Sequence, residues 1–551
     1  MKQSHILMIT LATIATMGCS HKQKVDLVVY NATVYTVDST FSQAEAFAID
    51  KGRFVAIGTT ADIRAHYRGA EEVDAKQKPV YPGFMDGHSH LGSLGENLLR
   101  YANLGGCNSF DEVLQRLKAH YDKYKPEWLL GRGWDQNLWP DKAFPTNEEL
   151  NRLFPDCYVA ITRIDGHAGL VNDKLLQLMG YTADTQIDGG AVLTDQKHHM
   201  TGILLDAAYD RVKERIPKPT AAERTKGLLA AQEACFAAGL TTVSDAGLPL
   251  STIQLIDSLH TDGTLLIRVI AMIDPDSATT SYFYAHGPLH KERLTVSSLK
   301  LYADGALGSR GANLIEPYAD DPTNSGLKIY TDEYYLAQCK AAYDAGFQVS
   351  THAIGDQGVR NMLHYYSQYL TPGNDRRWRI EHSQVVHPDD LPLYGKYNII
   401  PSIQSTHATS DAPWAAERLG ARVKNAYAYQ QLLQQNGWLI NGTDFPIEDI
   451  SPLGTFYSAV ARKSAVRLMA GNPDSEAFQP ENALSRQDAL RSITLWVARG
   501  AFDEQRRGSI EVGKDADFVI LSDDIMTIPI DQVPTTQTEA LYLAGQKVYG
   551  K

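Results

Sequence analysis

The stretch Tyr81-Pro-Gly-Phe-Met-Asp-Gly-His-Ser-His-Leu91 contains a short apolar segment that leads to two histidines at alternate positions. In a β-strand, alternate side chains point to the same face, which would place the Cα atoms of His88 and His90 about 6.6 Å apart. This spacing suits two ligands of one metal ion, although two exposed loop histidines would give the same pattern. The metal interpretation is favoured because four further segments supply matching residues at or near predicted strand ends.

Apolar segments alternate with helical patterns through the middle of the chain. One of these patterns, at residues 331–345, ends at Gly346, as expected of a helix with a glycine after its last turn. Eight such strand–helix units predict an α/β fold of the (β/α)8 TIM-barrel type, in which the reactive groups lie at the carboxyl ends of the strands. The predicted strands are residues 80–85, 239–244, 265–272, 298–303, 346–351, 378–381, 399–403 and 437–441.

Both ends of the chain are rich in short β-strand patterns separated by turn residues. Residues 25–80 contain four of them, and similar patterns follow at 516–521, 540–543 and 547–549. We therefore expect one small β-sandwich domain formed from the two chain ends, with two independent β caps as the alternative. The barrel would then span residues 81–484, and residues 485–551 would contain its end and the second part of the β-sandwich.

An unusually long interval separates the first predicted barrel strand from the second. It spans about 150 residues, far more than an ordinary loop. We expect an inserted subdomain at about residues 92–217, with a helix at 111–124 and a strand at 157–162. Long insertions above the mouth of a barrel commonly shape the substrate pocket.

The first eighteen residues have the pattern of a signal peptide. A charged start at Met1-Lys2 is followed by a short apolar run at residues 6–17, too short for a permanent membrane-spanning helix. The Gly18-Cys19 pair resembles a bacterial lipobox, although Thr16 replaces the usual leucine. We expect an exported protein, lipid-anchored through Cys19 in the bacterial cell envelope and facing the periplasm or the cell surface. Residues 19–24 would form the tether; an unprocessed cytosolic N-terminus is the alternative.

The overall composition is that of an ordinary globular protein. Charged residues make up 21% and hydrophobic residues 43%, and the net charge of −13 without any basic block argues against nucleic acid as a partner. The cysteines after Cys19 lack Cys-x-x-Cys spacing, which excludes zinc-finger and disulfide-scaffold classes. The expected partner is a small-molecule substrate, contact with the membrane is expected only through the lipid, and a homodimer is possible.

Polar residues recur at the ends of the predicted strands. Lys300 lies in the fourth strand, His352 follows the fifth, and His382 follows the sixth. Asp444 comes three residues after the eighth. In a (β/α)8 barrel all these positions lie at the same end as His88 and His90.

The order His-x-His, Lys, His, His, Asp on successive barrel strands resembles the amidohydrolase superfamily. The flanking residues are similar to its amidohydrolase-3 branch, which includes N-substituted formamide deformylase-like enzymes. The likeness extends over about residues 25–550. It rests on the motifs Pro82-Gly-Phe-Met-Asp-Gly-His-Ser-His90, Gly131-Arg-Gly-Trp-Asp135, Asp165-Gly-His-Ala168, Asp304-Gly-Ala-Leu-Gly-Ser-Arg310, Gly442-Thr-Asp444 and Gly513-Lys-Asp-Ala-Asp517.

The resemblance implies a site for two divalent metal ions. His88 and His90 would hold the more buried ion, with Asp444 near it. His352 and His382 would hold the second ion. Lys300 would be carboxylated and bridge the pair, because an ammonium has no lone pair whereas a carbamate is an anionic oxygen ligand. From the spacing alone, a surface or salt-bridged lysine is the alternative.

Mixed histidine and carboxylate ligation suits zinc, with manganese, iron or cobalt as alternatives. Two such ions can lower the pKa of a bridging water from about 15.7 towards 7, and the resulting hydroxide would attack a carbonyl. Asp444 would accept the proton of the water and deliver it to the leaving nitrogen. We therefore expect a metal-dependent hydrolase of a non-peptide carbon–nitrogen bond in an amide, N-acyl or N-formyl group.

Further polar and aromatic residues could contact the substrate, each with a structural alternative. His167 could be a substrate or oxyanion contact or a hydrogen-bonded structural histidine. Arg310 could bind a substrate carboxylate or pair with a nearby acid. Trp134 and Asp135 could line the pocket, although packing explains the tryptophan equally well, and His407 could face the barrel mouth.

Other functions remain open at this stage. The same site could cleave an ester, a lactone or a phosphoester. Deamination is disfavoured, because deaminases of the superfamily generally have one metal and no bridging lysine. A non-catalytic, lipid-anchored binding protein would be expected to have lost some ligands, yet every ligand type is present.

Overall fold

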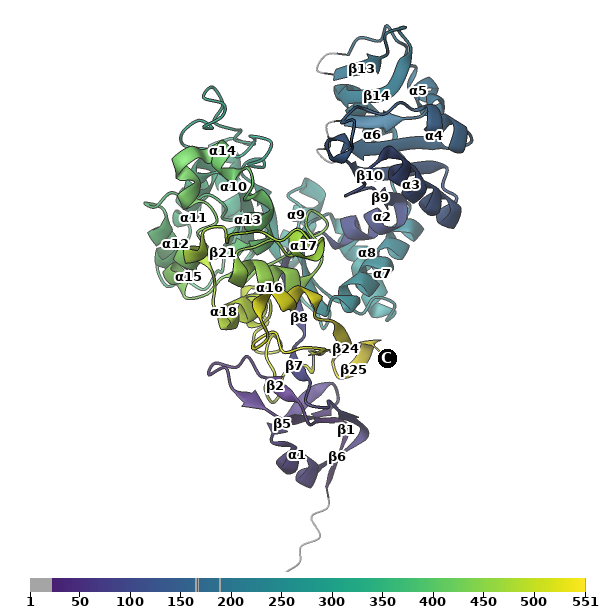
Figure 1. Ribbon diagram of the computed structural model, residues 1–551. Helices are drawn as coiled ribbons and strands as arrows, with labels where there is room; N and C mark the ends of the chain where they lie inside the picture. Colours follow the sequence, from purple (N-terminus) through teal and green to yellow (C-terminus); the bar gives the residue numbers. More distant parts are fainter. Residues whose placement is uncertain (1–21, 164–165, 167, 188–189, 551) are drawn as a thin grey trace, which may run out of the picture.

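The computed structural model describes residues 22–163, 166, 168–187 and 190–550; the predicted signal peptide, Cys19 and His167 lie outside this part. Three regions are visible in Figure 1. A barrel occupies the centre, a β-rich domain containing both chain ends lies below it, and an inserted domain extends above it. Among the described helices, none is both long and apolar enough to cross a membrane.

The centre of the molecule is a sheet of parallel strands that closes on itself. The order of the strands around it is β22-β21-β20-β19-β18-β16-β15-β8. The N–H of Asp444 donates to the carbonyl of His88 at 2.8 Å, and the N–H of His90 donates to the carbonyl of Phe445 at 2.8 Å, which joins the last strand to the first. The predicted (β/α)8 barrel is thus confirmed. Its strands are β8 (Phe84–Ser89), β15 (Leu240–Leu248), β16 (Arg268–Ile273), β18 (Leu294–Tyr302), β19 (Gln348–Ala353), β20 (Arg379–His382), β21 (Ile400–Ile403) and β22 (Ile440–Asn441).

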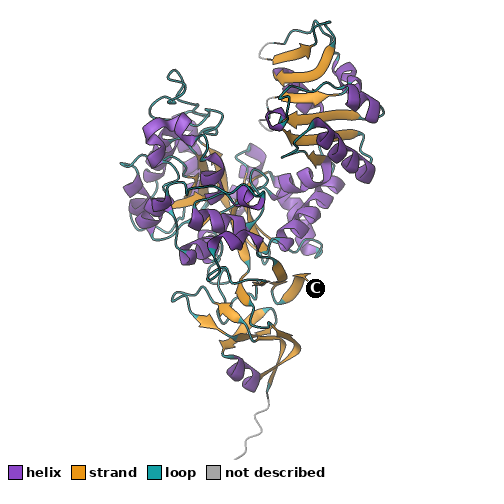
Figure 2. Ribbon diagram, viewed as in Figure 1, coloured by secondary structure: helices purple, strands orange, loops and turns teal. Residues whose placement is uncertain are grey.

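Helices surround the barrel strands, as Figure 2 shows. Their ends follow sequence signals: α7 starts with a capping box in which Thr220 and Glu223 bond each other's backbone N–H groups. The short strand β17 (Leu289–His290) pairs antiparallel with β18. The helices after the insertion are α7 (Ala221–Ala237), α8 (Leu250–Thr261), α9 (Ser277–His286), α10 (Asp332–Asp344), α11 (Asp356–Ser367), α12 (Leu391–Tyr397), α13 (Ser405–Asp411), α14 (Ala415–Leu419), α15 (Tyr429–Asn436), α16 (Pro452–Ala461), α17 (Ala465–Met469), α18 (Arg486–Ser492) and α19 (Leu495–Gly500).

The apolar segment before His88 is divided between two sheets, which corrects the single predicted strand at residues 80–85. Residues 79–82 form β7 of the β-rich domain, and the barrel strand β8 begins at Phe84. Gly83 lies between them, and a Cβ atom there would be 2.4 Å from the side chain of Thr241 on β15. A glycine is required because the chain passes this close to the neighbouring strand as it changes sheets.

The β-rich domain is a sandwich of two sheets. One sheet has the order β5-β4-β1-β6; the other has the order β25-β24-β23-β7-β2-β3 and combines strands from both chain ends. Apolar residues of the two sheets share one core, in which the rings of Phe47 and Phe518 are 5.0 Å apart. Its elements are β1 (Gln23–Tyr30), β2 (Thr33–Tyr35), β3 (Gln43–Ala44), β4 (Ala46–Asp50), β5 (Arg53–Gly58), α1 (Thr60–His66), β6 (Tyr67–Asp74), β7 (Pro79–Pro82), β23 (Phe518–Leu521), β24 (Thr538–Leu543) and β25 (Gln546–Gly550).

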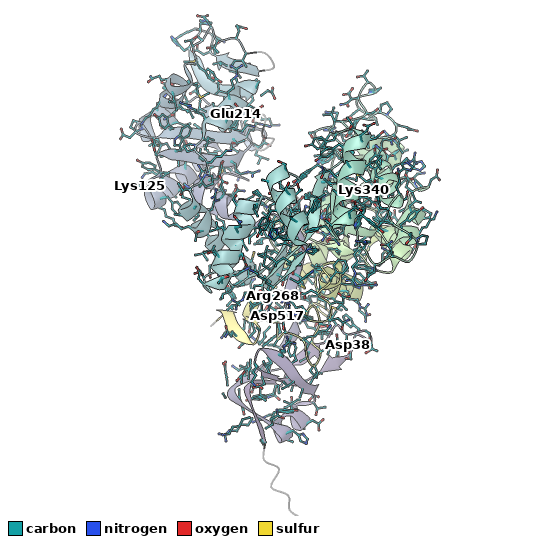
Figure 3. All side chains as sticks on the ribbon, turned by 180° about the vertical axis from the view of Figure 1, so that it is seen from behind. Asp38, Lys125, Glu214, Arg268, Lys340 and Asp517 are labelled. Carbon is teal, nitrogen blue, oxygen red and sulfur yellow. The ribbon has the colours of Figure 1, made fainter. Side chains whose placement is uncertain are left out.

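A buried ion pair links the sandwich to the amino-terminal end of the barrel. Arg268 at the start of β16 donates to Asp517 through Nε at 2.9 Å and through Nη2 at 3.1 Å. Figure 3 shows the two residues side by side at the junction of the two domains. Both side chains are almost fully buried, so the pair fixes this junction at the end of the barrel opposite the predicted site.

The insertion has its own sheet and its own apolar cores. The order of the sheet is β13-β14-β12-β11-β10-β9, and two clusters of buried residues flank it. The predicted helix and strand within it correspond to α3 and β11. Its elements are α2 (Leu91–Arg100), β9 (Tyr101–Asn103), α3 (Phe110–Tyr124), β10 (Trp128–Trp134), α4 (Glu148–Leu153), β11 (Tyr158–Arg163), β12 (Ala168–Val171), α5 (Asp173–Met179), β13 (Gly190–Thr194), β14 (Met200–Asp206) and α6 (Ala207–Arg215).

Two glycines allow the helices at the base of the insertion to pack closely. A Cβ atom on Gly95 of α2 would lie 2.2 Å from the carbonyl oxygen of Gly227 on α7. Helix α2 leads from His90 into the insertion, and α7 leads back to the barrel. This contact therefore fixes the base of the inserted domain beside the barrel mouth.

We expect Gly95→Ala to lower the free energy of unfolding by about 1–3 kcal/mol, because the added methyl group would push α2 and α7 apart. Gly92 is the matched control on the same helix, since no atom lies within 4 Å of a Cβ atom at that position. Gly92→Ala should be neutral or stabilise the protein by up to about 1 kcal/mol. Urea denaturation followed by circular dichroism measures both, and equal midpoints for the two variants would contradict the close-packing argument.

Candidate metal centre

Five predicted metal ligands meet at the carboxyl ends of the barrel strands. Ligand atoms of His88, His382 and Asp444 all lie within 4.8 Å of one another. The ring centroids of His88 and His90 are 5.6 Å apart, and those of His352 and His382 are 4.5 Å apart. Residues that are up to 356 positions apart in the sequence thus form one compact group of metal-ligating atoms.

Lys300 points into this group from β18. Its Nζ lies 3.3 Å from Nε2 of His88 and 5.2 Å from the centroid of the Tyr302 ring. Burial lowers the pKa of Lys300 to about 8, although Glu381 and Asp444 favour its charged form. A buried lysine with a lowered pKa is a typical feature of a functional site.

Asp444 is positioned by a turn in which its own backbone has a φ of 61°. One carboxylate oxygen lies 3.2 Å from Nε2 of His90, and the other lies 3.5 Å from Nε2 of His407. Burial favours the protonated form of Asp444, but the adjacent imidazoles of His90, His88 and His407 outweigh it and hold the pKa below its usual range. The carboxylate is therefore ionised and available as a ligand or a proton acceptor.

Two of the histidines have their Nδ1 atoms engaged away from the centre. His88 Nδ1 lies 2.5 Å from Oε2 of Glu381, and His382 Nδ1 lies 2.6 Å from Oε1 of Gln404. Because both partners are acceptors, each ring is protonated at Nδ1 and presents an unprotonated Nε2. Burial and the nearby Lys300 lower the pKa of His88 to about 4, and burial lowers that of His382 further below its ordinary value. Neutral imidazole is the form that binds a metal.

Several ligand atoms of the group are buried without a hydrogen-bond partner among the described residues. They are Nε2 of His352, Nε2 of His407 and Oδ1 of Asp444. A buried polar atom without a partner is costly, and most have one. A divalent cation accepts electron pairs from imidazole nitrogen and carboxylate oxygen, so the residues present fit a metal ion.

Carboxylates behind the ligands hold the strand ends in place. Asp86 accepts hydrogen bonds from the N–H of His88 at 3.0 Å and from the hydroxyl of Thr443 at 2.7 Å. Asp304 accepts backbone N–H groups from the loop after β19, and its Oδ1 lies 3.6 Å from Nε2 of His352. These contacts fix the ligands relative to one another across the barrel.

The sequence reasoning did not assign functions to these supporting residues. Glu381 directly precedes His382, Asp86 lies two positions before His88, and Gln404 follows the seventh strand. The signal available was their position at strand ends beside the predicted ligands. Their contacts depend on which strands neighbour one another, which the motifs do not state.

The predicted substrate-contacting residues lie in different places. His407 on α13 belongs to the group around Asp444. Trp134 is instead buried in the core of the insertion, where its Nε1 donates to the carbonyl of Ile161, so it does not line the site. Arg310 pairs with an acid, Asp320, at 2.8 Å, which was its structural alternative. Asp135, predicted to line the pocket, lies 2.7 Å from Arg163. His167 lies outside the described residues.

A cavity of about 990 Å³ opens beside the metal-ligating group. His90, Asp245 and Tyr302 line it on the barrel side, and Tyr124 and Trp128 of the insertion line it opposite. Residues of helices α2 and α7 also line it. The size and the mixture of aromatic and polar groups are typical of a small-molecule pocket.

Comparison with known proteins places these features in a family. The model of the amidohydrolase family, branch 3, matches residues 71–549. Among curated proteins, the chain is similar to Protein LONG AFTER FAR-RED 3 of Arabidopsis thaliana, with 32% identity over 95% of this chain and 91% of the relative. It is also similar to the putative amidohydrolase YtcJ of Bacillus subtilis, with 30% identity over 94% of this chain and 98% of the relative.

A curated enzyme and a solved structure extend the comparison. The N-substituted formamide deformylase of Arthrobacter pascens is 24% identical over 94% of this chain and 97% of the enzyme. The crystal structure of an uncharacterized metal-dependent hydrolase from Pyrococcus horikoshii superposes with a TM-score of 0.76, at 29% identity, over 92% of this chain and 99% of that chain. The chain belongs to the amidohydrolase-3 branch of the amidohydrolase superfamily and is a metal-dependent hydrolase.

Proposed function

We propose that this hydrolase cleaves a non-peptide carbon–nitrogen bond, in an amide, N-acyl or N-formyl group of a small molecule. The observation that carries the proposal is the cluster of His88, His382 and Asp444 around the buried Lys300. The similarity to an enzyme named N-substituted formamide deformylase supports the choice of bond.

We further propose that the centre takes two divalent ions, with zinc as the expected metal. His88, His90 and Asp444 would hold one ion, and His352 and His382 would hold the other. When bound, the ions would supply Lewis-acid activation of water and of the scissile carbonyl. The nitrogen and oxygen donors of this set suit zinc.

Lys300 would join the two metal positions as a carbamate. The neutral amine attacks the carbon of carbon dioxide, a nitrogen–carbon bond forms, and one proton is released. Since burial lowers the pKa of Lys300 to about 8, the neutral amine is far more accessible near pH 7 than in an ordinary lysine. The product is an anionic ligand with two oxygen atoms, which suits a position between two cations.

Asp444 would act as the general base and then as the general acid. Its ionised carboxylate can accept a proton from the attacking water, and the same proton can then pass to the leaving nitrogen. His407, 3.5 Å from Oδ2 of Asp444, is placed to hydrogen-bond either the carboxylate or the substrate. The aromatic side chains of Tyr124 and Trp128 on the far side of the cavity would bind the body of the substrate.

An ester, a lactone or a phosphoester is the alternative substrate class, since the same activated water would serve. A panel of N-formyl, N-acyl, ester, lactone and phosphoester compounds tests the choice. Hydrolysis of the amides over the oxygen esters would support the proposal, and the reverse preference would assign the protein to the alternative class. Absence of any hydrolysis by metal-loaded protein would favour a binding protein.

We also propose that the protein is exported and anchored in the bacterial cell envelope through a lipid on Cys19, on the basis of the N-terminal sequence. Cys19→Ala should then move the protein from the membrane fraction to the soluble fraction, as measured by immunoblotting of fractionated cells. An unchanged distribution would argue against the lipid anchor.

We expect Lys300→Ala to lower the zinc content from about two ions per chain to one or fewer and to abolish hydrolysis. The physical reason is the loss of the anionic bridge between the two metal positions. Lys340→Ala is the matched control, because Lys340 is an exposed residue of α10 that pairs with Asp344 (Figure 3). Elemental analysis and activity assays on both variants check the prediction; two ions in the Lys300→Ala variant would exclude the carbamate bridge.

We expect Asp444→Asn to reduce kcat by about 10²–10⁴-fold, because an amide cannot accept the proton of the attacking water. The assay uses the best substrate found in the panel, at saturating zinc to compensate for weakened binding. Asp38→Asn, in a turn of the β-rich domain, is the control and should keep the wild-type rate (Figure 3). A kcat within about threefold of wild type for Asp444→Asn would remove Asp444 from proton transfer.

A further inference from the structure

The two histidines with engaged Nδ1 atoms differ in the charge of their partners. His88 faces the carboxylate of Glu381 at 2.5 Å, whereas His382 faces the neutral amide of Gln404 at 2.6 Å. All four side chains are buried. Each imidazole is therefore held through its Nδ1, but the two lie in unequal electrostatic environments.

Glu381 is fixed in position by three hydrogen bonds from its surroundings. Arg379 donates to it through Nε at 2.6 Å and through Nη2 at 2.9 Å, and the hydroxyl of Ser402 donates at 2.7 Å. The guanidinium of Arg379 therefore places a positive charge directly beside the Glu381 carboxylate. Arg379 also donates to the carbonyl of Gly87 at 2.7 Å, one residue before His88. One arginine thus holds both the carboxylate and the strand that carries the imidazole.

Gln404 provides no charge at the second histidine. Its Oε1 faces Nδ1 of His382, and its Nε2 donates to the carbonyl of Ser402 at 3.4 Å, which fixes the orientation of the amide. The backbone carbonyl of Gln404 accepts the hydroxyl of Tyr429 at 3.0 Å. The amide is therefore oriented by its neighbours but is electrically neutral.

The partner of the Nδ1 proton changes the strength of an imidazole as a ligand. An anionic acceptor draws the proton and raises the electron density at Nε2, so the ring donates more strongly to a metal. A neutral amide has a smaller effect. Partners of this kind typically contribute 10- to 100-fold to metal affinity.

We propose that Glu381, held by Arg379, and Gln404 are positioning residues that make the two metal positions unequal in affinity. The position served by His88 retains its ion, and the position served by His382 exchanges its ion more readily. This inference rests on the proposed function, because it requires that both positions bind a metal.

Zinc titration of the full chain, stripped of metal and held in bicarbonate buffer, tests the proposal by calorimetry with a competing chelator. The wild type should bind in two steps of different affinity. Glu381→Gln gives His88 a neutral partner like that of His382, and the paired change Arg379→Met with Glu381→Gln does so without leaving a buried arginine unpaired. Both should weaken the tight step by about 10- to 100-fold and leave the other step unchanged.

The reciprocal change keeps the proposal falsifiable if the first variants fold poorly. Gln404→Glu gives His382 an anionic partner and should tighten the weak step, which a general loss of structure cannot do. The matched control is the paired change Arg268→Met with Asp517→Asn, which removes a buried arginine–carboxylate pair at the opposite end of the barrel (Figure 3). It should leave both steps as in the wild type.

Each outcome is decisive. Two equal steps in the wild type would overturn the inference while leaving the two-metal centre intact. An unchanged tight step after the Glu381 changes, or an unchanged weak step in Gln404→Glu, would also overturn it. Absence of zinc binding by the wild type would refute the proposed function itself, and the inference with it.

Discussion

Asp86 joins the first strand of the barrel to the segment after the last strand, and the metal centre depends on this junction. Its buried carboxylate accepts the N–H of His88 on the first strand and both the N–H and the hydroxyl of Thr443 after the last strand. These bonds place the His88 and His90 pair opposite Asp444. Without them, the segments that carry the ligands would meet only through backbone contacts, and the distance between the imidazoles and the carboxylate would not be fixed.

The two ends of the barrel use buried charge differently. At the amino-terminal end, Arg268 and Asp517 satisfy each other and hold the β-sandwich against the barrel. At the carboxyl-terminal end, Arg379 and Glu381 also pair, but the carboxylate of Glu381 contacts His88 as well. Beyond this pair, Nε2 of His352, Nε2 of His407 and Oδ1 of Asp444 have no hydrogen-bond partner among the described residues. The amino-terminal end of the barrel thus has charges that pair with each other and stabilise the fold. The carboxyl-terminal end has polar atoms available to ligands, as is usual in this fold.

Much of the architecture was predictable because its signals are local. Buried parallel strands read as short apolar runs, and the sequence indicated each of the eight barrel strands near its observed place. The division of residues 79–85 between two sheets was missed, since an apolar run does not reveal which sheet it joins. For Trp134 the sequence left pocket lining and core packing open, and only the tertiary structure shows that it packs inside the insertion.

The sequence by itself determined the alternation of strands and helices, the polar residues at the strand ends and the family to which they belong, because each depends on residue types at short spacing. The tertiary structure decided which of these residues meet. Closure of the barrel brings Glu381 to His88 and Gln404 to His382. Loop packing brings Arg310 to Asp320. Such contacts arise from the summed geometry of the whole chain, and no local pattern encodes them.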